Sequence, residues 1–328
     1  MRIYLYIFVI LSLAGIAFGQ VEGDDDITVD ASLVRLNVGV VNNSGRPITH
    51  LSKRSFSVFE DGVEQEILNF EPVAAPFSVV MILDMSGSTL GFRETIKLSA
   101  NRFLDALSPS DRVSVIEFYD KVNVLNDFTS DRRKVSYSIN VANGKGKTRL
   151  YEALETALSK LATEGTRRKA IIVLTDGIDT AARDIDRDIL SKMDDSEMPN
   201  ALNPDANPKL NAVLQSASRQ GVTIYPLALP TGDPAKLADP TPIQVEMYEV
   251  ARKRLDILAR RTGGELNAIN RLEEMGVLYA RVAANVRSLY TIEYQPKNDK
   301  KDGKWREIKL VLTMPDLIYT TRPGYFAK

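Results

Sequence analysis

The middle of the chain alternates short apolar runs with longer segments of helical periodicity. The apolar runs are almost uninterrupted, which is typical of strands buried on both faces of a parallel sheet. They occupy residues 78–83, 170–174 and 222–229. The segments between and after them repeat apolar residues every three or four positions, as amphipathic helices do. These segments are residues 93–107, 150–162, 247–262 and 273–286. The alternation predicts an α/β fold with a doubly wound, mostly parallel sheet that is Rossmann-like.

Strand patterns also occupy both ends of the chain. Between residues 34 and 40, every second residue is an apolar Val or Leu, the period of a half-buried strand. Asp61-Gly62 separates two further strand-like runs and predicts a hairpin. Residues 289–294 and 305–312 are strand-like as well, and we expect the charged residues 297–304 between them to form a solvated hairpin loop. A piece of fewer than about 50 residues rarely has a stable core of its own, so the two ends are expected to share one.

Composition narrows the possible chemistry. The net charge is −1, which gives no reason to expect binding to nucleic acid. The absence of cysteine excludes disulfides and thiolate metal sites, and the single histidine, His50, excludes sites with several histidines.

The first 19 residues have the pattern of a secretory signal peptide. Arg2 precedes an apolar run over residues 3–16, and Ala17-Phe18-Gly19 is a small-x-small cleavage pattern. An uncleaved anchor is the alternative, although the run is short for a membrane span of about 20 residues. We therefore expect a secreted or periplasmic bacterial protein, with membrane contact only if this segment is retained.

Oxygen-bearing side chains follow the first apolar strand. Asp84, Ser86 and Ser88 occupy alternate positions in the loop after residues 78–83. Loops at the carboxyl ends of strands bind ligands in open α/β sheets. One carboxylate with two neutral hydroxyls suits a small hard cation such as Mg²⁺. Because no base lies beside these serines in the sequence, they are interpreted as ligands rather than nucleophiles.

Two more segments complete this pattern. Thr148 stands at the start of the helix predicted over 150–162, and Asp176 follows the strand predicted over 170–174. Over residues 76–286, this order of Asp-x-Ser-x-Ser, Thr and Asp resembles the von Willebrand factor type A domain and its metal-ion-dependent adhesion site, in the form seen in secreted bacterial proteins.

The resemblance implies a set of ligands and a function. It assigns one Mg²⁺, or alternatively Mn²⁺ or Ca²⁺, to five residues of this sequence. These are Asp84, Ser86, Ser88, Thr148 and Asp176. It further implies that an Asp or Glu carboxylate of a protein partner completes the coordination, so that the domain is a cation-dependent adhesion or interaction module. Related proteins insert such a domain into a β-sandwich.

We therefore expect four segments along the chain. They are a signal peptide at 1–19, a β segment at 27–73, the type A domain at 74–286 and a second β segment at 287–328 that pairs with the first. The alternative function is a structural or assembly protein of the cell envelope whose metal site stabilises the fold.

The sequence supports an enzymatic function less well than a binding function. The segment ending in Gly146-Lys147-Thr148 imitates a phosphate-binding loop, but Val141 stands where that motif needs glycine, so no nucleotide is expected. A serine hydrolase would need His50 as its base. A metal-dependent hydrolase would need a base near the ion, and Asp179 is the candidate. We expect the protein not to be an enzyme.

Two long segments depart from a compact type A pattern. Residues 180–208 and 230–245 both follow strands and are expected to border the metal face. Their Asp, Pro and Asn content predicts little buried apolar area and high mobility. The first would surround the ion with an acidic rim that repels most acidic partners. The rim residues would be Asp184, Asp186, Asp188, Asp194 and Asp195.

Overall fold

The computed structural model describes residues 33–73, 75–233, 235, 238–269 and 275–327. The predicted signal peptide lies outside these residues. No helix within the described part of the chain is both long enough and apolar enough to cross a membrane.

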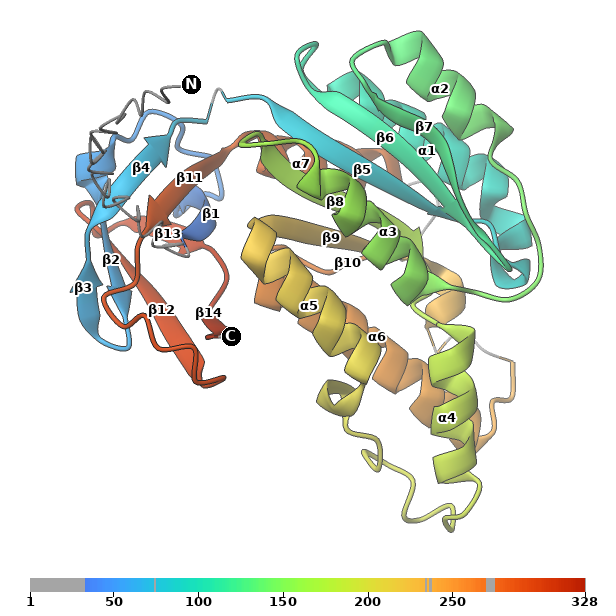
Figure 1. Ribbon diagram of the computed structural model, residues 1–328. Coiled ribbons are helices and arrows are strands. Elements are labelled where there is room, and N and C mark those ends of the chain that lie inside the picture. Colours follow the sequence, from blue (N-terminus) through green and yellow to red (C-terminus); the bar gives the residue numbers. More distant parts are fainter. Residues whose placement is uncertain (1–32, 74, 234, 236–237, 270–274, 328) are drawn as a thin grey trace, which may run out of the picture. The chain divides into compact units, whose positions relative to one another are not determined.

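A six-stranded sheet forms the centre of the fold (Figure 1). Its strand order is β10-β9-β8-β5-β6-β7, and all neighbouring pairs are parallel except β6 and β7. The strands are β5 (Phe77–Asp84), β6 (Arg112–Phe118), β7 (Val122–Thr129), β8 (Arg168–Thr175), β9 (Val222–Ala228) and β10 (Asn267–Ala268). Every residue of β5, β8 and β9 is buried, which explains why these strands are apolar without alternation. The predicted fold class is confirmed.

Helices cover both faces of this sheet. The helices are α1 (Arg93–Ala106), α2 (Arg132–Val141), α3 (Leu150–Ala162), α4 (Thr180–Leu190), α5 (Pro208–Gln220), α6 (Pro242–Thr262) and α7 (Met275–Arg287). Alternate residues of β5 enter two separate cores. Val79, Met81 and Leu83 pack with α1, α2 and α7, whereas Val80 and Ile82 pack with α3, α5 and α6. Each such side chain stabilises the fold by about 1.5–3 kcal/mol when fully buried.

Local signals define where several helices begin and end. At α6, Thr241 and Gln244 form a capping box and Pro242 takes the first position. The helix stops at Gly263, whose φ of 81° lies in the left-handed region that favours glycine. At α4, the Asp179 side chain accepts the backbone N–H of Ala182.

The two ends of the chain pair with each other in two antiparallel sheets. One sheet has the order β13-β1-β11-β4 and the other β14-β12-β2-β3. The strands are β1 (Val34–Asn42), β2 (Phe56–Glu60), β3 (Val63–Gln65), β4 (Ile67–Glu71), β11 (Leu289–Tyr294), β12 (Trp305–Leu312), β13 (Leu317–Thr320) and β14 (Gly324–Phe326). Val34 lies opposite Tyr294 and Phe56 opposite Leu312, and residues from both ends share one core.

The Asp61-Gly62 hairpin is present, but the strand that follows it divides. Both turn residues have positive φ, 49° and 81°, as tight hairpin turns require. After Gln65 the chain leaves this sheet, and Ile67 pairs with Tyr294 in the other one. A single alternating pattern therefore serves two sheets.

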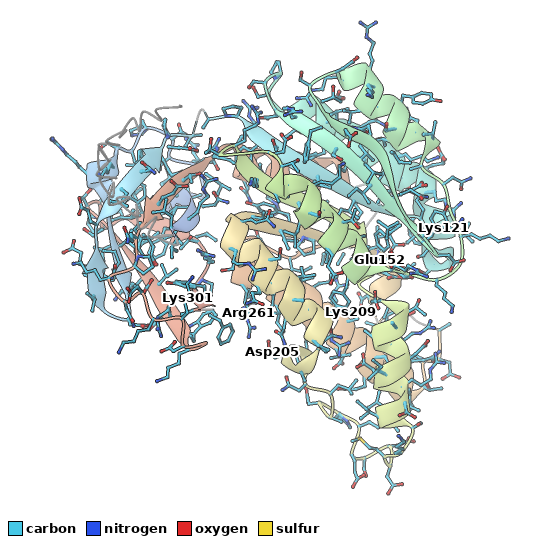
Figure 2. The ribbon with its side chains drawn as sticks, in the orientation of Figure 1. Lys121, Glu152, Asp205, Lys209, Arg261 and Lys301 are labelled. Carbon is cyan, nitrogen blue, oxygen red and sulfur yellow. The ribbon has the colours of Figure 1, made fainter. Side chains whose placement is uncertain are left out.

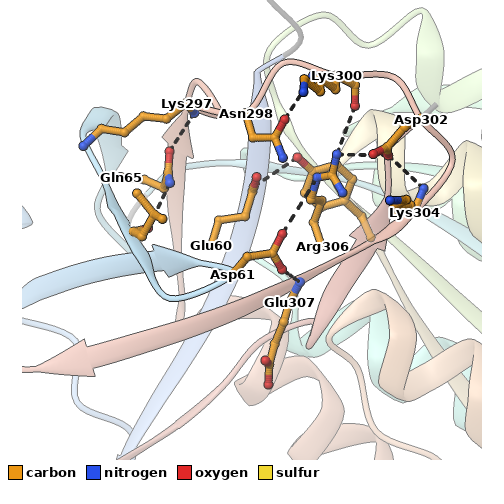
Figure 3. A network of polar contacts seen from close by, with 12 residues as sticks. Glu60, Asp61, Gln65, Lys297, Asn298, Lys300, Asp302, Lys304, Arg306 and Glu307 are labelled. Atoms are coloured by element: carbon orange, nitrogen blue, oxygen red, sulfur yellow. Dashed lines mark hydrogen bonds and ion pairs between the residues drawn. The ribbon is translucent and has the colours of Figure 1, made fainter.

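Residues 297–304 do not form a hairpin loop. They connect β11 in one sheet to β12 in the other. Figure 3 shows how the loop is held: the buried Arg306 donates to the Lys300 carbonyl and to Asp302, and the Lys297 N–H donates to Gln65. The expectation of a hairpin was wrong because a charged run between two strands does not reveal which strands they pair with.

A small separate hydrophobic core forms between α4, the residues that follow it, and α6. It contains Leu190, Met198, Leu202, Met247 and Val250. Residues 180–208 thus contribute a helix and buried apolar side chains, contrary to the expectation of little buried area. The sparse apolar residues of this segment are spaced so that they meet α6.

Candidate functional site

Asp84 ends β5 and is completely buried. Its Oδ1 accepts the N–H of Ser86 at 3.0 Å, and its Oδ2 accepts the hydroxyl of Thr175 at 2.7 Å. The Thr89 hydroxyl donates to the Asp84 carbonyl at 2.8 Å and lies 3.1 Å from the carbonyl of Ser86. The loop after β5 is therefore closed by its own polar groups.

The two serines of this loop place their hydroxyls side by side. Ser86 is buried and Ser88 is exposed, and their Oγ atoms are 3.1 Å apart. Ser88 belongs to a short 3-10 helix, Gly87–Phe92, which directly precedes α1. The pair thus leads from the buried Asp84 to the protein surface.

Asp176 follows β8, the sheet neighbour of β5, and is buried beside Asp84. Burial, and then the charge of Asp176, raise the pKa of Asp84 to about 7. Burial also raises the pKa of Asp176, against the opposing effects of the Ser88 hydroxyl and the Ile178 N–H. These two carboxyl groups share one small site with Ser88.

Thr148 lies in the loop between α2 and α3, and hydrogen bonds join this loop to the other two. Gly87 N–H donates to the Gly146 carbonyl at 3.1 Å. Thr148 N–H donates to the Thr180 hydroxyl, and Thr180 N–H donates to the Thr148 carbonyl, both at 2.9 Å. The structure therefore brings together the loops that carry all five residues expected at the site.

Three supporting residues escaped the sequence analysis. Thr175 orients Asp84, Thr89 closes the first loop and Thr180 joins the second loop to the third. The only available signal was position, because each threonine lies within four residues of an expected ligand. Whether a threonine hydroxyl faces a carboxylate is decided by strand pairing, which the sequence does not display.

The donor set fits a hard divalent cation. The groups are two carboxylates and neutral hydroxyls, all of them oxygen ligands, and two negative charges balance one divalent ion. Among the described residues, no Lys or Arg forms an ion pair or hydrogen bond with Asp84 or Asp176. Nor does the described part of the chain contain a group of three or more His, Cys, Asp or Glu placed to hold a metal. An ion here would need the hydroxyl groups as ligands.

The expected acidic rim requires correction. Asp186 is buried in an ion pair with Arg254 of α6, with atom separations of 2.5 and 2.9 Å. Asp184 pairs with Arg183 at 3.1 Å, and Asp188 pairs with Lys192 at 2.8 Å. Asp194 and Asp195 are exposed. The rim is less negative than its composition predicts, because α4 orients Asp186 inward and the nearby Arg183 and Lys192 pair with two other Asp residues.

The second long segment, which starts at Pro230, borders the site. It begins with a 3-10 helix, Pro230–Gly232, directly after β9. A Cβ on Gly232 would lie 2.1 Å from the Asp176 carbonyl oxygen, so only glycine allows this close approach.

The geometry does not favour the enzymatic readings. The glycine-lysine loop connects α2 to α3, whereas a phosphate-binding loop follows a strand. Asp179 accepts N–H groups of Ala182 and Tyr151 on its two oxygens. His50 lies between β1 and β2, in the part of the chain that precedes the central sheet. The chain enters that sheet at the first residue of β5, whereas Ser86 follows the last residue of β5.

Part of the chain matches a known protein family. Residues 79–178 match the family model described as von Willebrand factor type A domain. A comparison with curated proteins finds no match.

Three solved structures are among those to which the chain is similar. The vWF domain of the type V pili tip protein Mfa5 from Porphyromonas gingivalis is 16% identical, with a TM-score of 0.47, over 65% of this chain and 95% of that one. The von Willebrand factor type A protein from Catenulispora acidiphila is 13% identical, with a TM-score of 0.48, over 92% and 64%. The pilus adhesin SpaC from Lactobacillus rhamnosus GG is 11% identical, with a TM-score of 0.48, over 92% and 51%. Residues 79–178, which include all five expected site residues, are thus the part of this chain that matches the von Willebrand factor type A family.

Proposed function

We propose that this protein binds a divalent cation at the edge of its central sheet and, through it, a carboxylate of a protein partner. The observation that carries the proposal is the burial of Asp84 beside Asp176 with no Lys or Arg in an ion pair or hydrogen bond with either carboxylate among the described residues; Arg183 acts on Asp176 only from a distance. Two adjacent buried carboxylates are costly unless a cation or protons neutralise them.

The residues that would hold the ion are those joined by the three loops. Asp84 and Asp176 would supply the negative charge, and Ser86, Ser88 and Thr148 the neutral oxygens. A bound Mg²⁺, Mn²⁺ or Ca²⁺ would supply an electrophilic centre, because only two carboxylates offset its charge. Ser88 is exposed, which leaves the outer side of the site accessible to a partner.

The proposal includes export from a bacterial cell. It rests on the signal-peptide pattern of residues 1–19, with Arg2, the apolar run and the cleavage pattern. We further propose that the chain has no catalytic activity. Of the two bases considered among the described residues, Asp179 already accepts N–H groups on both oxygens, and His50 lies between β1 and β2.

A structural role of the ion is the second candidate. The hydrogen bonds between Gly87 and Gly146, and between Thr148 and Thr180, join loops that an ion would tie together further. In that case the cation would raise the stability of the protein without a partner.

Retention of envelope proteins tests the first candidate against the second. The immobilised protein is incubated with envelope extract in Mg²⁺ or in EDTA, alongside Asp84→Ala and the exposed control Asp316→Ala. A partner retained by wild type and Asp316→Ala in Mg²⁺, and lost in EDTA or with Asp84→Ala, supports cation-dependent binding. Retention that is the same in EDTA would contradict it, and a rise in melting temperature with Mg²⁺ alone would then favour the structural role.

A further inference from the structure

We infer that the partner presents several carboxylates rather than one, because a basic rim of Lys121, Lys145 and Lys147 borders the candidate cation site. This inference rests on the proposed function and adds the chemical class of the partner. It also reverses the expectation that an acidic surround would exclude acidic partners.

The three lysines come from two adjoining loops. Lys121 lies in the turn between β6 and β7, where Figure 2 shows its side chain extending into solvent. Lys145 and Lys147 lie in the loop between α2 and α3, directly before Thr148. All three side chains are exposed.

Contacts between the Asp120 side chain and the backbone of Gly146 and Lys147 hold the two loops together. Lys147 N–H donates to Oδ1 of Asp120 at 2.7 Å. Gly146 has a φ of 102°, and a Cβ there would lie 2.2 Å from Oδ2 of Asp120. Because the Gly146 carbonyl also accepts the Gly87 N–H, the lysine backbone is set beside the loop of Ser86 and Ser88.

A half-buried cation, Arg93, supports the same loops. Arg93 donates to Asn143 Oδ1 at 2.6 Å, to the Met85 carbonyl at 3.1 Å and to the Gly144 carbonyl. Its hydrogen-bond partners in the described part of the chain are all neutral, so it adds positive charge to this side while positioning the loop.

The lysines have no ion-pair partner of their own within the described residues. Glu152 is engaged by Arg149 at 2.8 Å, and Oδ1 of Asp120 by a backbone N–H. The ammonium groups are therefore available to an incoming ligand, whereas the acidic residues of α4 are paired or buried.

The chemistry of the rim favours carboxylates. Lysine ammonium groups are separate point charges that suit carboxylates spread along an extended segment. Phosphates are bound most specifically by paired donors of arginine. Arg93, Arg149 and Arg183 near the site already use their guanidinium groups within the protein. A protein segment with one carboxylate for the ion and others for the lysines matches both features.

Binding of labelled peptides tests the inference. The probes are two amidated and acetylated heptapeptides, one with a single central Asp and one with three Asp at alternate positions, titrated in Mg²⁺ and in EDTA. We expect the three-Asp peptide to bind wild type about tenfold more tightly in Mg²⁺. The triple variant Lys121→Glu, Lys145→Glu, Lys147→Glu should lose this advantage and bind the one-Asp peptide within about threefold of wild type. The added affinity should shrink in 0.5 M salt, where exposed charges are screened within about 3–5 Å.

A matched variant reverses the same number of charges away from the site. Lys297→Glu, Lys301→Glu, Lys309→Glu changes exposed lysines of the β-sandwich and should bind both peptides as wild type does. Equal affinity of wild type for the two peptides, with Mg²⁺ dependence intact, would overturn the inference and leave the proposed function standing. The inference would also be overturned if an oligothymidylate bound more tightly than the three-Asp peptide and lost this affinity in the rim variant, because that would indicate a phosphate partner. Absence of Mg²⁺-dependent binding to either peptide would overturn both proposals together.

Discussion

The hydroxyl of Thr175 donates a 2.7 Å hydrogen bond to Oδ2 of Asp84, across two neighbouring parallel strands. Both residues are completely buried. The bond fixes one carboxylate oxygen at the carboxyl end of the sheet, while Ser86 N–H fixes the other. Asp84 is therefore oriented by β8 as well as by its own loop.

Replacement of Thr175 by Val tests this role. Valine keeps the shape but removes the donor, so Mg²⁺ affinity should fall by about 10–100-fold, the usual cost of losing a partner of a metal ligand. Calorimetric titration with Mg²⁺ measures the change. Thr156→Val, a half-buried position of α3 whose hydroxyl bonds only within that helix, is the control and should bind Mg²⁺ like wild type. Unchanged affinity in Thr175→Val would show that Asp84 needs no support from β8.

The stability of the metal-free protein should fall as pH rises. The pKa of Asp84 is raised from 3.8 to about 7 by burial and by Asp176, so between these values the folded protein holds a proton that the unfolded chain has released. The stabilisation is therefore fully present below about pH 4 and is lost as pH rises through about 7. Each pKa unit corresponds to about 1.4 kcal/mol, so the free energy of unfolding should decrease by a few kcal/mol.

Urea unfolding in EDTA between pH 5 and 8 measures this slope. Asp84→Asn removes the titrating group and should flatten the slope, which separates it from the titration of other carboxyl groups. Saturating Mg²⁺ should restore the stability of wild type at pH 8 and leave Asp84→Asn unchanged. Identical slopes for the two proteins would rule out Asp84 as the source.

Removal of the buried Asp186 carboxylate should destabilise the protein strongly. Asp186→Ala leaves the buried Arg254 guanidinium without its hydrogen-bonded carboxylate, a change that typically costs about 3–5 kcal/mol. Asp188→Ala removes an exposed pair with Lys192 and should cost less than about 1 kcal/mol. Urea denaturation compares the two variants. Similar small losses would mean that Asp186 is hydrated rather than enclosed by α4 and α6.

A methyl group at Gly232, in the segment that follows β9, should displace Asp176 and so weaken the site. In Gly232→Ala the new Cβ would meet the Asp176 carbonyl oxygen at 2.1 Å, so the two segments must separate. We expect Mg²⁺ affinity to drop by at least about tenfold, and stability by about 1–3 kcal/mol. Gly91→Ala, where a Cβ would meet no atom within 4 Å, is the control for a new methyl near the site. Wild-type Mg²⁺ affinity in Gly232→Ala would mean that the segment around Gly232 moves without displacing Asp176.

The sequence by itself determined the elements and the order of the site residues. Strands buried on both faces must be apolar throughout, so β5, β8 and β9 were visible as runs, and helix periodicity marked α1, α3 and α6. The carboxyl ends of parallel strands lie at one edge, so Asp84 and Asp176 could be expected there together. Metal binding and the identity of the ion stay predictions.

Only the tertiary structure decided which groups face each other. The chain changes sheets after Gln65, where the alternating pattern shows no break. Asp186 contacts Arg254, and Thr175 donates to Asp84, although the residues of each pair are distant in sequence. Local patterns encode exposure and periodicity, but not pairing. The basic rim has the same origin, because the loop of Lys121 is joined to the loop of Lys147 by a hydrogen bond from the Lys147 N–H to the Asp120 side chain, 27 residues earlier in the sequence.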